Sequence, residues 1–209
     1  MAQAKTPTYN ERISPGRMTW EEYLEWCSED NDAEWVDGEI VWMSPVALDS
    51  GDITHFISVL LRHYVEHHDL GSVFVERILM RLATRPSGRE PDILFVAKER
   101  RSIHRKKYID GPADLAVEVV AEESRVRDRQ IKFQEYERAG VREYWIIDPD
   151  KKQADFYQLD ATGRYQAVPP DSEHVYHSAV LEGFWLKVDW LWQSPLPPVM
   201  SVLREWKIV

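Results

Sequence analysis

Alternating and helical patterns of apolar residues divide the chain into short segments. Residues 115–120, LAVEVV, predict a strand whose two faces are both apolar, as in the buried middle of a sheet. Glu118 is the one charged side chain in this run. A lone carboxylate removed from water costs several kcal/mol. Glu118 therefore needs a cation, hydrogen-bond donors or a proton of its own.

The N-terminal part predicts a helix, a hairpin and a second helix. Thr19 and Glu22 have the spacing of a capping box at the start of TWEEYLEWCSE. Asp37-Gly38 is a strong turn signal within AEWVDGEIVWMSP, and Ser44-Pro45 is expected to close this hairpin. In residues 52–67 the apolar side chains recur at the spacing of one buried helix face.

Strands separated by a helix are predicted for the remainder. GSVFVERILMRLAT, after Gly71, predicts a strand or a strand pair, and a short strand follows Pro91. A helix is expected over roughly residues 125–139, ended by Gly140 and followed by the strand REYWIIDP. The last segments predict a hairpin (QADFYQLDATGRYQAV), a strand (GFWLKVDWLW) and a short helix (MSVLREW). This order predicts an α/β or α+β sheet with helices packed against it.

Composition limits the class of protein. The chain has 209 residues, of which 44% are hydrophobic and 30% charged, so we expect one globular domain with one sizeable core. A formal net charge of −10 argues against binding nucleic acid by overall attraction. Cys27 is the single cysteine, which suits a reducing compartment. With no signal-peptide pattern and no long apolar run, we expect a soluble cytoplasmic protein with no membrane contact.

We expect the following division of the chain. Residues 1–17 are an N-terminal arm and residues 191–209 a C-terminal tail with a short helix. The domain between them, residues 18–190, comprises a core over 18–149 and a β extension over 150–190.

Candidate chemistry lies on two strands and one helix. Asp92, in EPDILFV, and Glu118 converge on one point if their strands are neighbours in the sheet. Asp128, Lys132 and Tyr136 are four residues apart and share one helix face. A helix packed on that sheet can direct Lys132 at the same point. Two carboxylates and an amine suit Mg²⁺ or Mn²⁺, which polarises a phosphate and activates a bound water.

Each of these residues also has a structural interpretation. Asp92 could bond backbone donors in the turn after Pro91, and Glu118 could form a buried ion pair with an arginine. Asp128 and Lys132 could be a solvated i,i+4 pair worth roughly 0.2–0.5 kcal/mol.

A basic loop joins the two candidate strands. Its lysines and arginines are Lys98, Arg100, Arg101, Arg105, Lys106 and Lys107. Arg100, Arg101, Arg105, Lys106 and Lys107 are candidate contacts to nucleic-acid phosphates, which would make binding salt-dependent. A solvated loop is the alternative.

A family resemblance links these segments. EPDILFV, DLAVEVV and RDRQIKFQEYERAGVREYWIIDP, with the hairpin AEWVDGEIVWMSP, resemble the Uma family of candidate bacterial endonucleases, a former domain of unknown function. That family belongs to the restriction-endonuclease-like superfamily named for its PD-(D/E)XK motif. The resemblance covers roughly residues 18–149, with a weaker echo in SAVLEGFWLKVDWLW. It implies a mixed β-sheet flanked by helices, extended here by additional C-terminal β-strands.

The resemblance also assigns residues to roles. Asp92 matches the motif aspartate and Glu118 the (D/E), so both would bind the metal, while Val120 stands where the usual lysine would be. The resemblance implies that Lys132 replaces that lysine and completes the catalytic set. Family members tend to have Ser-Pro after the glutamate strand, whereas this chain has Ala121-Glu122.

Accessory positions are Glu34, His55, Asp128 and Tyr136. Glu34 and His55 match positions of the family pattern, whereas Asp128 and Tyr136 share the helix face of Lys132.

The function implied is Mg²⁺- or Mn²⁺-dependent hydrolysis of DNA phosphodiester bonds, with a homodimer cutting two strands. Two alternatives stay open. One is a non-catalytic descendant of the nuclease fold that binds nucleic acid or a protein. The other is a metal-dependent hydrolase of another substrate.

Overall fold

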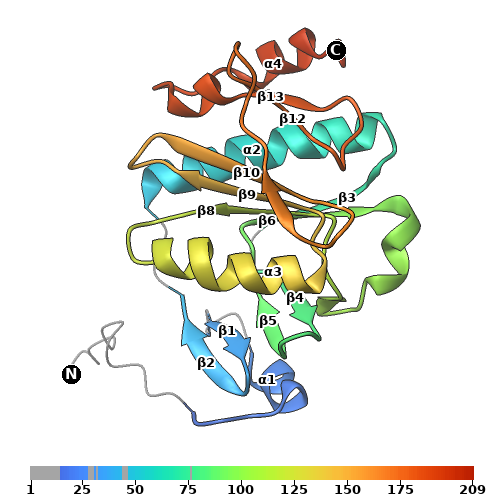
Figure 1. The fold of residues 1–209 in the computed structure, drawn as a ribbon, viewed down its shortest axis with the longest axis vertical. Helices are drawn as coiled ribbons and strands as arrows, with labels where there is room; N and C mark the ends of the chain where they lie inside the picture. The colour runs from blue at the N-terminus through green and yellow to red at the C-terminus, as the bar shows by residue number, and fades with distance from the viewer. Residues whose placement is uncertain (1–14, 28–30, 32, 44–46, 76) are drawn as a thin grey trace, which may run out of the picture.

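The computed structural model describes residues 15–27, 31, 33–43, 47–75 and 77–209. Within them, a six-stranded mixed sheet forms the centre of the molecule and two smaller sheets lie on either side of it (Figure 1). The predicted α/β fold, a mixed sheet flanked by helices with further C-terminal strands, is confirmed. The predicted Ser44-Pro45 closure lies outside the described residues.

The central sheet has the strand order β11-β10-β9-β8-β6-β3. Only β8 and β9 are parallel neighbours; the other described pairs are antiparallel. In that order the strands are Tyr165–Ala167, Gln153–Leu159, Glu143–Asp148, Leu115–Val119, Ile93–Ala97 and Gly71–Val75.

The second sheet lies below the first in Figure 1 and has the order β2-β1-β5-β4-β7. Its strands are Glu39–Trp42, Ala33–Val36, Ser87–Arg89, Leu79–Leu82 and Tyr108–Asp110. The Asp37-Gly38 turn joins β1 to β2 as predicted, and both of its residues have positive φ. A third, two-stranded sheet is formed by β12 (Val175–His177) and β13 (Trp185–Lys187).

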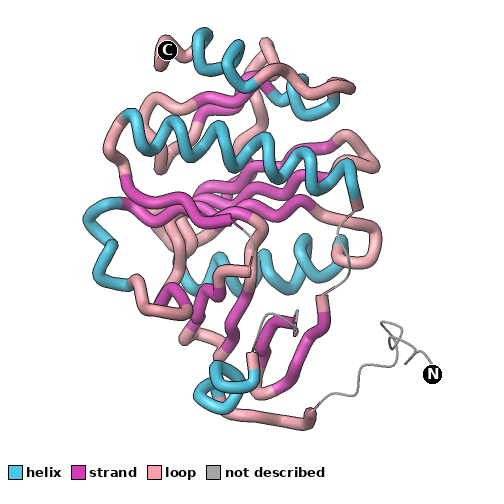
Figure 2. The backbone as a smooth tube through the Cα atoms, turned by 180° about the vertical axis from the view of Figure 1, so that it is seen from behind, coloured by secondary structure: helices cyan, strands magenta, loops and turns pink. Residues whose placement is uncertain are grey.

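Helices cover both faces of the central sheet (Figure 2). The α-helices are α1 (Trp20–Trp26), α2 (Leu48–His67), α3 (Phe133–Ala139) and α4 (Val199–Glu205). The π-helix η3 (Arg127–Lys132) runs directly into α3, and η2 (Lys98–Ile103) and η4 (Val188–Trp192) are 3₁₀ helices. The capping box of Thr19 and Glu22 is present at the start of α1, which confirms its prediction.

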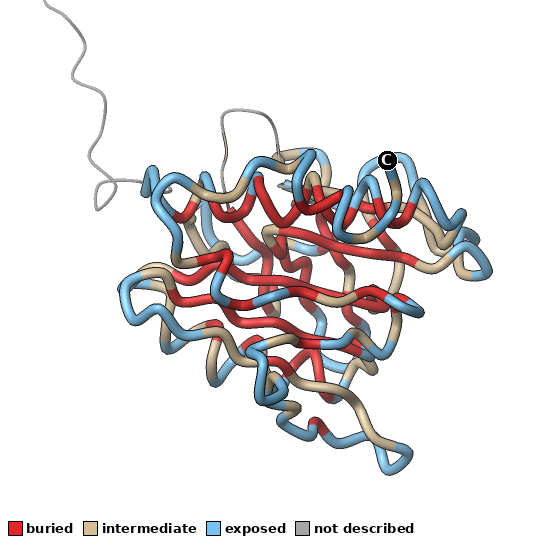
Figure 3. Tube along the Cα trace, turned by 90° about the horizontal axis from the view of Figure 1, so that it is seen from above, coloured by how far each residue is buried: buried red, intermediate tan, exposed pale blue. Residues whose placement is uncertain are grey.

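Strand β8 divides its side chains between two cores. Leu115, Val117 and Val119 pack with α2 and with the C-terminal layer, which consists of β12, β13, η4 and α4. Ala116 and Val120 pack on the other side, with α3. All of β8 is buried, as Figure 3 shows for most of the central sheet. Because side chains alternate along a strand, Glu118 faces the side of η3 and α3.

Three segments differ from their predicted form. The strand pair after Gly71 is split between two sheets, since β3 joins the central sheet and β4 the second one. The basic loop contains η2 and β7. In GFWLKVDWLW only Trp185–Lys187 is a strand, and the 3₁₀ helix η4 follows it. No helix in the described part is both long and apolar enough to cross a bilayer.

Candidate functional site

Topology brings Asp92 next to Glu118. Asp92 directly precedes β6, which is antiparallel to β8 with Ile93 opposite Val117. The first residues of β6 therefore lie beside the last residues of β8. The backbone N–H of Val119 donates a hydrogen bond of 2.6 Å to Asp92 Oδ2. The backbone bond expected of Asp92 is present, but its donor belongs to the neighbouring strand.

The partners of Glu118 come from the helix that follows. Lys132 Nζ and the Tyr136 hydroxyl each donate a hydrogen bond of 2.9 Å to Glu118 Oε1. Among the described residues, none donates to Glu118 Oε2. The ion pair anticipated for Glu118 therefore exists, but with a lysine in place of an arginine.

Lys132 is fully buried at the centre of three carboxylates. Its Nζ lies 2.9 Å from Glu118 Oε1, 3.1 Å from Glu34 Oε1 and 3.5 Å from Asp128 Oδ1. The solvated Asp128–Lys132 pair considered from the sequence is therefore wrong. The π-helix η3 places both residues in the interior. Segments of π-helix are rare in proteins, and those that occur are often found at functional sites.

Glu34 ties the second sheet to this cluster. The backbone N–H of Glu90 donates to its Oε1 at 3.0 Å, and Arg89 Nη1 donates to its Oε2 at 2.7 Å. Arg89 also donates two hydrogen bonds to Glu135, on the same helix as Lys132. Side chains of Glu34, Arg89 and Glu135 are all buried. The hairpin β1–β2, strand β5 and helix η3–α3 thus share one ionic network.

A cavity of about 60 Å³ opens beside the carboxylates. Asp92, Glu118 and Asp128 line it together with residues from α2 and the turn after β8. Asp128 Oδ1 is buried and accepts no hydrogen bond from the described residues. Ala121 lines the cavity, whereas Glu122 is exposed. The charge of Glu122 therefore points to solvent.

Two carboxyl groups at the cavity have raised pKa values. Asp92 is half-buried, and its removal from water raises its pKa to about 6, with Asp128 and Glu34 adding negative charge nearby. Burial likewise raises the pKa of Glu118 well above its usual range, and Lys132 only partly opposes this. Glu34 behaves in the opposite way: burial favours its neutral form, but Lys132 and Arg89 lower its pKa to about 2.

These residues fit a hard divalent cation. Asp92 and Glu118 each offer a carboxylate oxygen that accepts no hydrogen bond from the described residues, at a cavity short of positive charge. Within the described ranges, no three His, Cys, Asp or Glu side chains are placed to hold an ion by themselves. Mg²⁺ needs no such cage, because it keeps several waters and is bound through one or two carboxylates and substrate oxygens.

The accessory residues divide into two groups. Glu34, Asp128 and Tyr136 lie in the cluster around Lys132 and Glu118. His55 is exposed on α2 and is not among the described residues that line the cavity, although Ser50 and Thr54 of that helix are. The match of His55 to the family pattern therefore does not bring it to the cavity.

The basic loop lies at the other end of the central sheet from Asp92. Strand β6 leads away from Asp92, and Lys98 begins η2 directly after it. Arg100 pairs with Asp114, Arg105 with Asp110, and Lys107 donates to the Leu24 carbonyl. Of the other predicted contacts, Arg101 and Lys106 are exposed. A role in nucleic-acid binding stays a prediction, but it would act far from the carboxylates.

Sequence reasoning missed Arg89, Arg127 and Glu135. Glu135 lies three residues after Lys132, so the helix period that grouped Asp128, Lys132 and Tyr136 could have found it. Arg89 ends a three-residue strand, SGR, too short for any periodic signal.

Comparison with known proteins identifies the family. The model of the Uma2 family, described as "Putative restriction endonuclease", matches residues 20–189. This chain belongs to the Uma2 family. The resemblance of EPDILFV, DLAVEVV and the following helix is thereby confirmed.

A solved structure shares the Uma2 fold. It is a protein from Anabaena variabilis whose title describes a putative nuclease belonging to DUF820. The two chains are 14% identical, with a TM-score of 0.69 over 84% of this chain and 97% of the other. No curated protein matches this Uma2 chain.

Proposed function

We propose that this Uma2 protein is a Mg²⁺- or Mn²⁺-dependent endonuclease that hydrolyses phosphodiester bonds of DNA. The observation that supports the proposal is that Asp92 and Glu118 line one cavity, while the buried Lys132 donates a hydrogen bond to Glu118 from outside the cavity lining. A family of nuclease-like members supports a nucleic-acid substrate. Two such sites in a homodimer would cut both strands, which stays a prediction.

Asp92 and Glu118 would hold the divalent cation, since both line the cavity and each has a carboxylate oxygen that accepts no hydrogen bond from a described residue. When bound, the cation lowers the pKa of a water and polarises the phosphate. Tyr136 and Lys132 both bond Glu118 Oε1, which holds the carboxylate in one orientation. Glu34 and Asp128 then hold Lys132 in place from the other side.

Lys132 acts in its charged form. Burial opposes its charge, but Glu118, Glu34 and Asp128 outweigh burial and raise the Lys132 pKa above its usual range. An ammonium group has three donors and no acceptor, so Lys132 cannot take the proton of the attacking water. It would instead position Glu118 through their hydrogen bond, and its charge would stabilise negative charge that develops on the phosphate.

The reaction forms one P–O bond to the water oxygen and breaks one P–O bond to a sugar oxygen. The water gives up a proton to solvent and the leaving oxygen takes one up, so the products are a phosphomonoester end and a hydroxyl end.

The test is nicking of supercoiled plasmid in the presence of Mg²⁺ or Mn²⁺. We expect Asp92→Asn, Glu118→Gln and Lys132→Met each to lower the rate by about 100-fold or more. Lys187→Met, which alters an exposed lysine on β13, should keep the wild-type rate. Cleavage by Asp92→Asn at the wild-type rate would refute the assignment. Metal binding without cleavage of any nucleic acid would favour a hydrolase of another substrate.

A further inference from the structure

The inference concerns Arg127 and rests on the proposed function. Arg127 is the first residue of η3, and it lines the cavity with Asp92, Glu118 and Asp128. Glu123 lines the same cavity, so four acidic residues belong to its lining. Among the described residues that line it, Arg127 is the only basic one. An anionic substrate that enters this cavity therefore has one fixed positive side chain to meet.

The guanidinium group of Arg127 has unused donors. Its Nε is buried and makes no hydrogen bond with any described residue. Its ion pair within the described part, to Asp128 Oδ1, spans 3.7 Å, which is too long for a hydrogen bond. A buried donor without a partner is costly, and an acceptor that enters the cavity would satisfy it.

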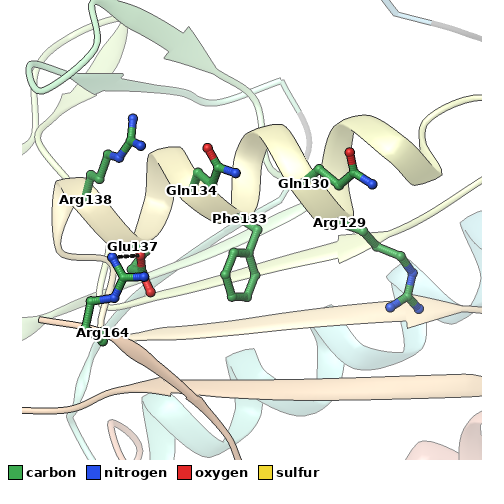
Figure 4. A pocket seen from close by; sticks show the side chains of 7 residues that line it. All are labelled: Arg129, Gln130, Phe133, Gln134, Glu137, Arg138 and Arg164. Atoms are coloured by element: carbon green, nitrogen blue, oxygen red, sulfur yellow. Dashed lines mark ion pairs between the residues drawn. The ribbon is translucent and has the colours of Figure 1, made fainter.

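Other arginines near this helix line a different cavity from Arg127. A second cavity, of about 390 Å³, lies on the outer side of η3–α3 (Figure 4). Arg129 there pairs with Asp155 at 2.6 Å, although its Nε and Nη2 are also buried without a hydrogen bond to a described residue. Arg164, which directly precedes β11, pairs with Glu137. Figure 4 shows Arg138 at the opposite end of the helix from Arg129. Arg138 is exposed and lines this second cavity, not the one with the carboxylates.

We infer that Arg127 binds the phosphate group at which the strand is cut. A guanidinium presents donors in a planar fork that matches two phosphate oxygens, and such charge-assisted bonds are about twice as strong as neutral ones. Asp92 and Glu118 cannot hold a phosphate themselves, because carboxylates repel it. Arg127 thus supplies the positive charge that a phosphate needs in a cavity otherwise lined by carboxylates. The ligand expected at Arg127 is a phosphodiester, which this side chain would recognise through the phosphate oxygens and not through a base.

The first test follows Arg127 directly with inorganic phosphate. Phosphate is titrated into ¹⁵N-arginine-labelled protein with Mg²⁺ present, and the Nε–H resonance of Arg127 is assigned from its loss in Arg127→Lys. We expect this resonance to shift saturably with phosphate and not with chloride at the same ionic strength. A resonance that does not move, or that moves equally with chloride, would overturn the inference.

The second test measures the salt dependence of binding to a labelled DNA duplex in EDTA, where cleavage does not interfere. We expect Arg127→Met to raise the Kd on the order of tenfold and to reduce the slope of log K against log salt by about 0.9. The matched control Arg138→Met removes the same charge from the same helix and should leave both unchanged. Equal behaviour of the two variants would refute the assignment.

The outcomes separate this inference from the proposed function. A phosphate-dependent shift at Arg127 in a protein that cuts no nucleic acid would support the phosphate site and refute the nuclease. Wild-type cleavage that Arg127→Met retains in full, with an unmoved resonance, would refute the phosphate site and leave the nuclease.

Discussion

At the scale of single residues, the site contains carboxylates that form close ion pairs with basic side chains and carboxylates that do not. Glu34 has direct partners in Lys132 and Arg89, and its pKa is about 2. Asp92 accepts a single backbone hydrogen bond, and its pKa is about 6. Asp92 therefore destabilises the metal-free fold at neutral pH, as expected of a group kept for binding and not for stability.

Replacing Asp92 by Asn should stabilise the protein without metal. The folded pKa of Asp92 lies above its unfolded value of about 3.8, so the carboxylate is tolerated below that pH and costs stability as pH rises through 6. The difference between the folded pKa of about 6 and the unfolded pKa of about 3.8 predicts a gain of about 3 kcal/mol for Asp92→Asn at about pH 8, which disappears below about pH 3.8. Urea unfolding in EDTA at both pH values measures this. An Asp92→Asn variant no more stable than wild type at the higher pH would contradict it.

The roles of single residues were predicted unevenly. Two apolar strand faces around Glu118 indicated a buried carboxylate, because alternation is a local property of the chain. Lys132 could be assigned only through the family resemblance, since an i,i+4 pair looks the same on a surface as in an interior. Arg89 could not be found at all, because its importance comes from residues 55 and 46 positions away in the chain.

At the scale of elements, buried ion pairs join three segments around the site. Arg89 on β5 bridges Glu34 on β1 and Glu135 on α3, and its side chain is 2% exposed. The ionic groups fix how the second sheet meets the helix that carries Lys132. Removal of one member leaves buried charges without partners, which is far more costly than breaking a surface pair.

Arg89→Met should lower the free energy of unfolding by about 3–5 kcal/mol. Arg62→Met is the matched control, because Arg62 and Glu66 form an exposed i,i+4 pair on α2 and its loss should cost less than about 1 kcal/mol. Urea denaturation of both variants decides the point. If Arg89→Met were no more destabilised than Arg62→Met, the network would not hold the second sheet.

Sequence pattern predicted elements better than their pairing. The capping box of Thr19 and the turn at Asp37-Gly38 are present because their causes lie within a few residues. The segment after Gly71 contains two strands, but no local signal shows that β3 and β4 join different sheets. The π-helical turn of η3 could not be predicted either, since RDRQIK has one apolar residue and therefore no periodic pattern.

At the scale of the whole molecule, the site and the C-terminal layer lie on opposite faces of the central sheet. The core shared by α2, β12–β13 and α4 contains the odd-numbered residues of β8, whereas Glu118 faces η3. Phe184 is buried in the C-terminal layer, with ring contacts to Tyr64, Trp145 and Trp206. This layer stabilises the sheet but contributes none of the residues in the carboxylate cluster.

Phe184→Ala should therefore separate stability from binding. The cavity it leaves should lower the free energy of unfolding by about 3–5 kcal/mol. Metal affinity of the folded variant at low temperature should equal that of wild type, because the carboxylates keep their partners. Thermal unfolding and a Mn²⁺ titration measure the two effects. A large loss of Mn²⁺ affinity in folded Phe184→Ala would show that the two faces are coupled.

The most direct measurement is a calorimetric Mn²⁺ titration of the wild type beside Asp92→Asn and Glu118→Gln, with Asp189→Asn as the exposed-carboxylate control. We predict that wild type and Asp189→Asn bind Mn²⁺ and that both site variants, while folded, do not. Absence of binding in the wild type, or equal binding by all four proteins, would contradict the metal site. Glu118 would then be a structural partner of Lys132.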